Sequence, residues 1–179
     1  MNREDFQTLS DLLKKRSGLS IGRDKEYLLE SRLAQIASEE SCRDAGELAR
    51  KIRKGGVRDR VLVKVTEAMT TNETFFFRDQ KPFDAFRDSV LPEILKSRAD
   101  QKRLRIWSAA CSNGQEPYSI AMILKDTAPK LSGWKIDIVA TDISGEMVES
   151  AKRGHYSQFE VQRGLPVSYL AKHFKRSGD

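Results

Sequence analysis

Residues 103–124 read RLRIWSAACSNGQEPYSIAMIL, and this stretch decides the fold class. Its order of an apolar run, a cluster of small residues and a segment opened by Pro117 predicts a strand, a turn and a helix. Residues 135–154, KIDIVATDISGEMVESAKRG, repeat the unit, with a strand to about Thr141, Ser144 as a helix N-cap and Gly154 as its C-cap. Successive strand–helix units predict a parallel sheet of the α/β class.

Helical periodicity dominates the chain before this stretch. Apolar residues recur at helical spacing in four segments: 6–13 with a stop at Gly18, 25–38, 41–54 with Ser41 as its cap and Gly55-Gly56 as its end, and 57–69. These segments predict a small all-α bundle, and Pro82 and Pro92 each stand where a further helix begins. We therefore predict a helical module over residues 1–69, a linker over 70–91 and an α/β part over 92–179.

Positive charge is concentrated in one short region. The chain of 179 residues has a net charge of +6, and residues 50–64, RKIRKGGVRDRVLVK, hold seven basic side chains and one acidic side chain. Such a patch points to an acidic partner, which is nucleic acid, anionic lipid or an acidic protein, with a solvated helix face as the alternative. The phenylalanines lie away from the patch instead of interleaving with it, which disfavours nucleic acid.

Other features of the composition narrow the class of protein. The chain has no run of 18 apolar residues, and its N-terminus, MNREDFQTLS, lacks the apolar core of a signal peptide, so we expect a cytoplasmic protein without membrane insertion. Cys42 and Cys111 stand far apart and match no metal spacing, which fits a reduced compartment. We expect no metal site.

The first candidate site is SAACSNGQEPYS, residues 108–119, at the end of the first strand. Its small residues allow a ligand to approach the backbone, and the helix that follows offers free N–H groups. Glu116 lies near the start of that helix, where it is placed to receive a hydroxyl or an amine of the ligand. Because only one glycine is present, the stretch is not a dinucleotide-binding fingerprint, and a plain tight turn remains the alternative.

The second candidate site is ATDIS, residues 140–144, with Asp142 just after the second strand. An acid in this position commonly binds the two hydroxyls of a ribose, although Asp142 also suits a helix N-cap. The small-residue turn and the acid together suggest a nucleoside ligand without a pyrophosphate. S-adenosylmethionine has that shape.

Catalytic bases are scarce in this sequence. His155 and His173 are the two histidines and stand far along the chain from the turn, and Cys111 needs no role beyond filling it. A reaction that needs little proton transfer is therefore expected, with no general base. Methyl transfer to a glutamate carboxylate meets this condition, because a free glutamate with a pKa of about 4.3 is already ionised at neutral pH.

Three separated blocks carry a resemblance to a known family. MTTNETFFFRD (69–79), RIWSAACSNGQEPYSIAM (105–122) and ATDIS (140–144) resemble the chemotaxis receptor methyltransferases, the CheR family, in order and approximate spacing. The resemblance covers nearly the whole chain. It implies an all-α module before a Rossmann-like domain that transfers methyl from S-adenosylmethionine to glutamate side chains of chemoreceptor signalling helices. The products would be glutamyl methyl esters and S-adenosylhomocysteine.

The resemblance also implies roles for single residues. Asn72, Thr74 and Arg78 would line the cofactor site, with Arg78 on the methionine carboxylate of the ligand. Glu116 would hold its amino group and Asp142 its ribose. The run Phe75–Phe77 would be buried between the two modules and over the ligand, with a purely structural aromatic hinge as the alternative. The residues implied in receptor docking are Arg43, Arg50, Arg53 and Lys54.

Members of the family are longer than this chain, which ends at HFKRSGD. The family continues with the rest of the sheet, an Asn-rich part of the cofactor pocket and a small β-subdomain. We therefore expect part of a longer enzyme, incomplete and weakly active or inactive as given, with a paired homodimer as one way to cover an exposed sheet edge. A receptor-binding module without catalysis is the alternative function.

Overall fold

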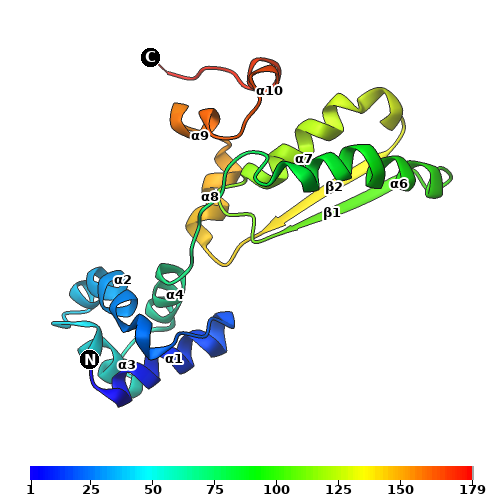
Figure 1. Ribbon diagram of the computed structural model, residues 1–179. Coiled ribbons are helices and arrows are strands. Elements are labelled where there is room, and N and C mark those ends of the chain that lie inside the picture. Colours follow the sequence, from blue (N-terminus) through cyan, green and yellow to red (C-terminus); the bar gives the residue numbers. More distant parts are fainter. Residues whose placement is uncertain (179) are drawn as a thin grey trace. The chain divides into compact units, whose positions relative to one another are not determined.

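The computed structural model describes residues 1–178 and divides the chain into two units, Met1–Thr71 and Asn72–Asp179 (Figure 1). Within the described residues, the first unit is helical and the second contains a two-stranded parallel sheet with helices. This arrangement confirms the predicted fold class, an all-α module followed by the first part of a Rossmann-like α/β domain.

The first unit is the predicted helical bundle. Residues 1–71 contain α1 Arg3–Ser17, the short 3-10 helix η1 Arg23–Lys25, α2 Glu26–Glu39, α3 Ala45–Arg53 and α4 Asp59–Ala68. Gly18 ends α1 as predicted, with a left-handed φ of 76° and its N–H donating to the carbonyl oxygen of Lys14 at 3.0 Å. The apolar face of each α-helix points into one core, whose fully buried members include Leu9, Leu13, Leu29, Leu33, Leu48 and Val65.

The third helix begins later than predicted. Ser41, the predicted N-cap, has a φ of 58°, and α3 starts at Ala45. Asp44 caps this helix instead, because its side chain accepts a hydrogen bond of 2.8 Å from the N–H of Glu47. The prediction for Ser41 is wrong because an N-cap residue needs extended backbone, which Asp44 has and Ser41 does not.

The second unit contains the two predicted strand–turn–helix segments. Its described elements are α5 Gln80–Ala85, the π-helical turn η2 Phe86–Val90, α6 Leu91–Ser97, β1 Arg103–Ala109, α7 Gln115–Asp126, the 3-10 helix η3 Ala128–Leu131, β2 Lys135–Thr141, α8 Gly145–Arg153, α9 Gln158–Gln162 and α10 Val167–His173. Ser144 caps α8 and Gly154 ends it, as predicted. The sequence signals for these helix ends were therefore correct.

The elements α5, η2 and α6 follow one another without a break. Pro82 lies in the first turn of α5 and Pro92 at the second position of α6. In η2 the N–H of Leu91 donates to the carbonyl oxygen of Phe86, five residues back. Pro92 has no N–H to donate, and the π-helical turn before it lets the helix continue past this proline.

The sheet is covered by helices on one face in the described residues. β1 and β2 pair in parallel, with Leu104 opposite Ile136 and Ala109 opposite Thr141. Leu104 packs with Leu91 of α6 and Leu124 of α7 in one apolar cluster. The opposite face exposes 69% of Trp107. Because the strands are parallel and in register, their carboxyl ends meet at one edge, where ligand sites of such sheets lie.

The helices are short in both units. α1 has 15 residues and α2 has 14, whereas a helix that spans a bilayer needs about 20. In residues 1–178, no helix combines the length and the apolar character that a membrane crossing requires.

Candidate functional site

A tight turn after β1 forms the centre of the candidate site. Ala110, Ser112 and Gly114 have left-handed φ values of 63°, 48° and 95°. The N–H of Cys111 donates to the carbonyl oxygen of Thr141 at 2.9 Å, so the turn folds back onto the end of β2. Glycine adopts left-handed backbone freely at Gly114, whereas Ala110 and Ser112 adopt it against the steric cost of their Cβ atoms. The predicted turn between β1 and α7 is confirmed.

Asp142 joins the ends of the two strands. Its Oδ2 accepts a hydrogen bond of 2.7 Å from the N–H of Ser112, and its Oδ1 accepts one of 2.9 Å from the N–H of Ser144. The N-cap of α8 is Ser144, whose Oγ accepts from the N–H of Met147, and not Asp142. A carboxylate has about four acceptor sites. The half-buried Asp142 therefore retains acceptor sites for hydroxyl groups of a ligand.

Glu116 lies in the first turn of α7, as predicted. Its Oε1 accepts a hydrogen bond of 2.7 Å from the hydroxyl of Ser108, which is buried at the end of β1. This bond ties the exposed carboxylate of Glu116 to the strand. The positive end of the α7 dipole favours a negative charge here. Both predicted acids therefore lie at the carboxyl edge of the sheet.

The segment Asn72–Arg78 lies against the same turn. The hydroxyl of Ser112 donates to the carbonyl oxygen of Asn72 at 2.8 Å, and the N–H of Phe77 donates to Ser119 Oγ at 3.0 Å. Because Ser112 also donates to Asp142, hydrogen bonds connect Asn72 with Asp142 through one residue. The structure thus brings together two predicted site residues that lie far apart in the sequence.

The phenylalanine run is buried in the core of the second unit. Phe76 is 0% exposed and Phe77 is 5% exposed, and both belong to a cluster with Ile123 and Leu165. The predicted location between the two modules is wrong for these two rings. Neighbours supplied by residues 83–174 surround them instead, which is possible because α9, α10 and their flanking residues return over the segment. Phe75 is half-buried.

The contacts of Arg78 lie within its own segment. The exposed guanidinium of Arg78 donates to the carbonyl oxygen of Glu73 at 2.8 Å and lies 5.7 Å from the centre of the Phe75 ring. Thr74 is half-buried in the same segment. In the described residues, Arg78 therefore folds back on its own segment, with its planar group near the surface. Within residues 1–178, Arg78 contacts neither Asp142 nor Glu116.

A cavity of about 270 Å³ lies beside the turn, between α7, α8 and β2. Its lining is mainly apolar and includes Cys111, Gly114 and Tyr118. None of the five predicted cofactor residues lines this cavity. The predicted residues lie on an open edge instead, with Asn72, Arg78 and Glu116 exposed.

Cys111 and His173, two of the groups considered as catalysts, lie in different parts of the second unit. Burial raises the pKa of the Cys111 thiol, and the negative charge of Asp142 raises it further, so the thiol stays protonated at neutral pH. His173 Nε2 lies 3.3 Å from Asp126 Oδ1, at the far end of α7 from the turn. In residues 1–178, no group of three or more His, Cys, Asp or Glu side chains is arranged to hold a metal ion.

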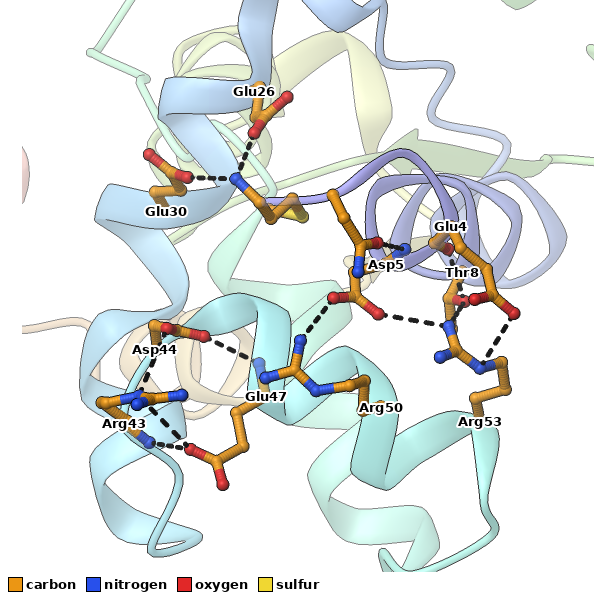
Figure 2. Close-up of polar contacts among 12 residues, drawn as sticks. Glu4, Asp5, Thr8, Glu26, Glu30, Arg43, Asp44, Glu47, Arg50 and Arg53 are labelled. Atoms are coloured by element: carbon orange, nitrogen blue, oxygen red, sulfur yellow. Dashed lines mark hydrogen bonds and ion pairs between the residues drawn. The ribbon is translucent and has the colours of Figure 1, made fainter.

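Two residues predicted for docking have partners inside the bundle (Figure 2). Arg50 Nη1 lies 2.6 Å from Asp5 Oδ2, and Arg53 Nη1 lies 3.2 Å from Asp5 Oδ1. Arg53 also donates to the hydroxyl of Thr8 at 3.2 Å. Asp5 is 0% exposed, so these guanidinium groups compensate a charge that water does not reach. Arg50 and Arg53 therefore hold α3 against α1.

The other basic residues of the 50–64 stretch differ in whether they form ion pairs within the first unit. Lys51 pairs with Glu40 at 3.0 Å, and Lys64 pairs with Glu39 at 2.6 Å. Among residues 1–178, three cations of this stretch have no acidic partner: Lys54, Arg58 and Arg60. Arg43, before the stretch, is highly exposed and lies 3.8 Å from Asp44. The cations that are open to a partner thus lie mainly at the turn between α3 and α4.

The sequence analysis missed the contribution of residues 156–164. Tyr156 OH donates to the carbonyl oxygen of Asn113 at 2.8 Å, and Glu160 Oε1 accepts from the amide of Asn113 at 2.7 Å. Arg163 pairs with Glu73 at 2.7 Å. The Gly164-Leu165-Pro166 sequence signals a turn, but no local pattern indicates that these side chains reach residues 73 and 113.

Two family models match the chain. One, described as CheR methyltransferase, SAM binding domain, matches residues 72–179. The other, described as CheR methyltransferase, all-alpha domain, matches residues 4–70. The two matches meet where the structure divides, between Thr71 and Asn72.

Curated relatives align over almost the whole chain. Chemotaxis protein methyltransferase 1 of Pseudomonas aeruginosa is 41% identical over an alignment of 179 positions, which covers 97% of this chain and 64% of the relative. Chemotaxis protein methyltransferase Cher2 of Pseudomonas putida is 40% identical over 97% of this chain and 64% of the relative. For the chemotaxis protein methyltransferase of Vibrio parahaemolyticus, the identity is 36%, over 98% of this chain and 63% of the relative. The chain thus spans a little under two thirds of the length of these relatives.

Proposed function

The chain belongs to the CheR methyltransferase family, and on this basis we propose that it binds S-adenosylmethionine at the carboxyl ends of β1 and β2. As part of its enzyme, it methylates glutamate side chains of chemoreceptors, giving glutamyl methyl esters. The observation that carries the proposal is the chain of hydrogen bonds from Asn72 through Ser112 to Asp142. It joins the segment, the turn and the acid at the edge where parallel sheets bind ligands.

The chemistry of the side chains fits this cofactor. Asp142 has free acceptor sites for the hydroxyls of a ribose, and Glu116 offers a carboxylate for an ammonium group. The guanidinium of Arg78 offers a planar donor pair for a carboxylate. S-adenosylhomocysteine carries the same three groups and lacks only the methyl. We assign Asn72 and Thr74 to the wall of this site, because Asn72 is bonded to the turn and Thr74 lies two residues further on.

When bound, the cofactor supplies an electrophilic methyl group on sulfur. The chain's residues then have to bind and orient the two reactants and keep water away from the acceptor carboxylate. A free glutamate is ionised at neutral pH, since its pKa is about 4.3. The proposed transfer therefore needs no general base.

Calorimetric titration of the 179-residue chain with S-adenosylhomocysteine tests the cofactor site. We expect micromolar binding by the unchanged chain. The Arg78→Ala variant should bind about 10- to 100-fold more weakly, because a hydrogen-bonded charge contributes about 1.5–3 kcal/mol. Arg87→Ala is the control, since Arg87 pairs with Asp84 and Asp88 on the α5–η2 surface. Equal affinity of all three proteins would exclude Arg78 from the site.

We further propose that the helical unit docks on acidic signalling helices of chemoreceptors in the cytoplasm. The pattern of ion pairs within the unit supports Lys54, Arg58 and Arg60 as the main contacts, together with the exposed Arg43, because these cations are least engaged within the unit. Arg50 and Arg53 contribute to docking chiefly by holding α3 in place. Complementary charge of this kind governs encounter and orientation more than total affinity.

Charge reversal tests the docking surface. The Lys54→Glu/Arg58→Glu/Arg60→Glu variant should bind a chemoreceptor signalling fragment about tenfold more weakly at low salt, and the difference should shrink as the salt concentration rises. The control, Lys81→Glu/Lys96→Glu/Arg98→Glu, changes the net charge equally on the second unit. Surface plasmon resonance at two salt concentrations measures both variants. Equal losses in the two variants would argue for an effect of net charge alone and against this surface.

If the chain binds the receptor fragment but not S-adenosylhomocysteine, the receptor-binding module without catalysis becomes the better description. The two measurements therefore separate the two functions.

A further inference from the structure

Arg163 contacts two residues of the candidate cofactor segment. Its Nη2 lies 2.7 Å from Glu73 Oε1, across 90 positions of sequence. Its guanidinium lies 4.6 Å from the centre of the Phe75 ring, within the range of a cation–π contact. One side chain thus engages the residues on either side of Thr74.

The residue after Arg163 approaches the same segment through its backbone. Gly164 has a φ of 81°, and a Cβ atom placed on it would lie 2.2 Å from the carbonyl oxygen of Phe76. Only glycine allows the two backbones to come this close. Arg163 and Gly164 therefore contact residues 73–76 from the side of α9.

α9 itself is fixed to the turn after β1. The side chain of Glu160 accepts from the amide of Asn113 at 2.7 Å and from the N–H and hydroxyl of Ser157, completing a capping box at the start of the helix. The hydroxyl of Tyr156 donates to the carbonyl oxygen of Asn113 at 2.8 Å. The same short region thus holds the turn and, through Arg163, the segment that lies against it.

Asn72–Arg78 has no helix or strand of its own. Its conformation depends on contacts from other parts of the chain, which include the packing around the buried Phe76 and Phe77 rings and the bonds of Ser112 and Ser119. Arg163 adds its contacts with Glu73 and Phe75. The pKa of Glu73 is held below its ordinary value by its hydrogen bond with Arg163, so the pair is charged at neutral pH.

From these contacts we infer that Arg163 is a positioning residue, which fixes residues 72–78 against the turn after β1 by pairing with Glu73 and covering Phe75. This role rests on the proposed function, because the residues proposed to bind the cofactor, Asn72, Thr74 and Arg78, belong to this segment. Arg163 itself is not placed on the ligand. Arginine suits this role because its planar group forms an ion pair and stacks on a ring at once.

A merely structural role and a positioning role predict different results. Arg163 and Glu73 are 45% and 52% exposed in their side chains, and exposed ion pairs contribute little to global stability. The Arg163→Ala variant should therefore keep a melting temperature close to that of Arg87→Ala, whose side chain is 43% exposed and also ion-paired. If the variant adopts the ligand-binding arrangement of residues 72–78 only a tenth of the time, its affinity for a ligand falls about tenfold.

Hydrogen exchange without ligand tests the inference directly. In the 179-residue chain, Arg163→Ala should speed the exchange of the Phe77 and Arg78 amides, which are bonded to Ser119 and Phe75. Arg87→Ala should leave their exchange unchanged. Arg163→Lys keeps the charge and loses the planar stack, so it should restore protection in part. The charge-swapped double variant Glu73→Arg/Arg163→Glu should also restore part of the amide protection, whereas Arg163→Glu alone should not.

Calorimetry on the same variants gives the functional readout. We expect Arg163→Ala to bind S-adenosylhomocysteine about tenfold more weakly. The charge-swapped double variant should recover part of this affinity. Unchanged amide exchange in Arg163→Ala would overturn the inference whatever the calorimetry gives. Faster exchange with unchanged affinity would overturn its link to the cofactor site. If the unchanged chain does not bind, the cofactor proposal fails for this chain, and the exchange data alone decide whether Arg163 fixes the segment.

Discussion

Replacing both Arg50 and Arg53 by methionine should lower the free energy of unfolding by about 3–5 kcal/mol. The change leaves the carboxylate of Asp5 buried at 0% exposure after removal of both of its arginine partners. Methionine preserves much of the apolar stem of arginine, so lost packing contributes less than the uncompensated charge. Urea denaturation followed by circular dichroism measures the loss.

Two control variants separate charge from packing. Asp5→Leu/Arg50→Met/Arg53→Met removes the whole cluster, and it should recover most of the lost stability because a buried ion cluster replaced by apolar residues is often neutral or stabilising. Arg43→Met removes a side chain that is 79% exposed and should cost less than about 1 kcal/mol. A double variant that is as stable as Arg43→Met would contradict the assigned role of the cluster.

This prediction has a consequence for receptor binding. If Arg50 and Arg53 hold α3 on α1, their replacement would weaken docking by distorting the bundle. A loss of binding in such variants is therefore not evidence of direct contact with a receptor. The variants at Lys54, Arg58 and Arg60 avoid this ambiguity, because these side chains have no acidic partner in residues 1–178.

Replacing Gly164 by alanine should destabilise the second unit by roughly 2–5 kcal/mol. Left-handed backbone costs a non-glycine residue roughly 1–2 kcal/mol. The added Cβ would also lie 2.2 Å from the carbonyl oxygen of Phe76 and 2.8 Å from Phe75 Cδ2. The carbonyl belongs to a segment whose neighbouring Phe76 and Phe77 rings are buried, so it cannot move away without disturbing that core.

Gly133→Ala provides a matched control for the backbone cost. Gly133 has a φ of 76°, close to the 81° of Gly164, but its added Cβ would meet nothing closer than 3.8 Å, on the flexible side chain of Lys102. It should cost roughly 1–2 kcal/mol. Thermal unfolding of both variants gives the difference, which reports the close approach of Gly164 to Phe76. Equal costs would show that the segment yields to the added methyl group.

The sequence predicted the secondary structure well where the signal was local. Gly18, Ser144 and Gly154 ended or capped helices as expected, because the conformation of a helix end depends on side chains and backbone within a few residues. Ser41 was the exception. Its chemistry suits an N-cap, but so does that of Asp44, and the backbone of the preceding turn favoured Asp44.

The candidate site was predictable in part for a related reason. Strand order in an α/β unit places the residues after successive strands at one edge, so the pattern alone predicted that Glu116 and Asp142 lie at that edge. The segment 72–78 was assigned to the site through its resemblance to a family, since nothing in the spacing of NETFFFRD indicates where it lies. Its phenylalanines were wrongly expected between the modules, because an apolar run shows that burial is needed without showing what provides it.

By itself the sequence determined the helices of the first unit, the two strand–turn–helix segments and the chemistry available at their ends. These features follow from periodicity and from the conformational preferences of neighbouring residues. Only the tertiary structure decided the partners of the charges: Arg50 and Arg53 with Asp5, and Arg163 with Glu73. The chain has 32 basic and 26 acidic side chains, and no local pattern selects among their pairings. The pairs form where burial of the apolar cores brings distant segments together, because that burial is the dominant favourable term in folding.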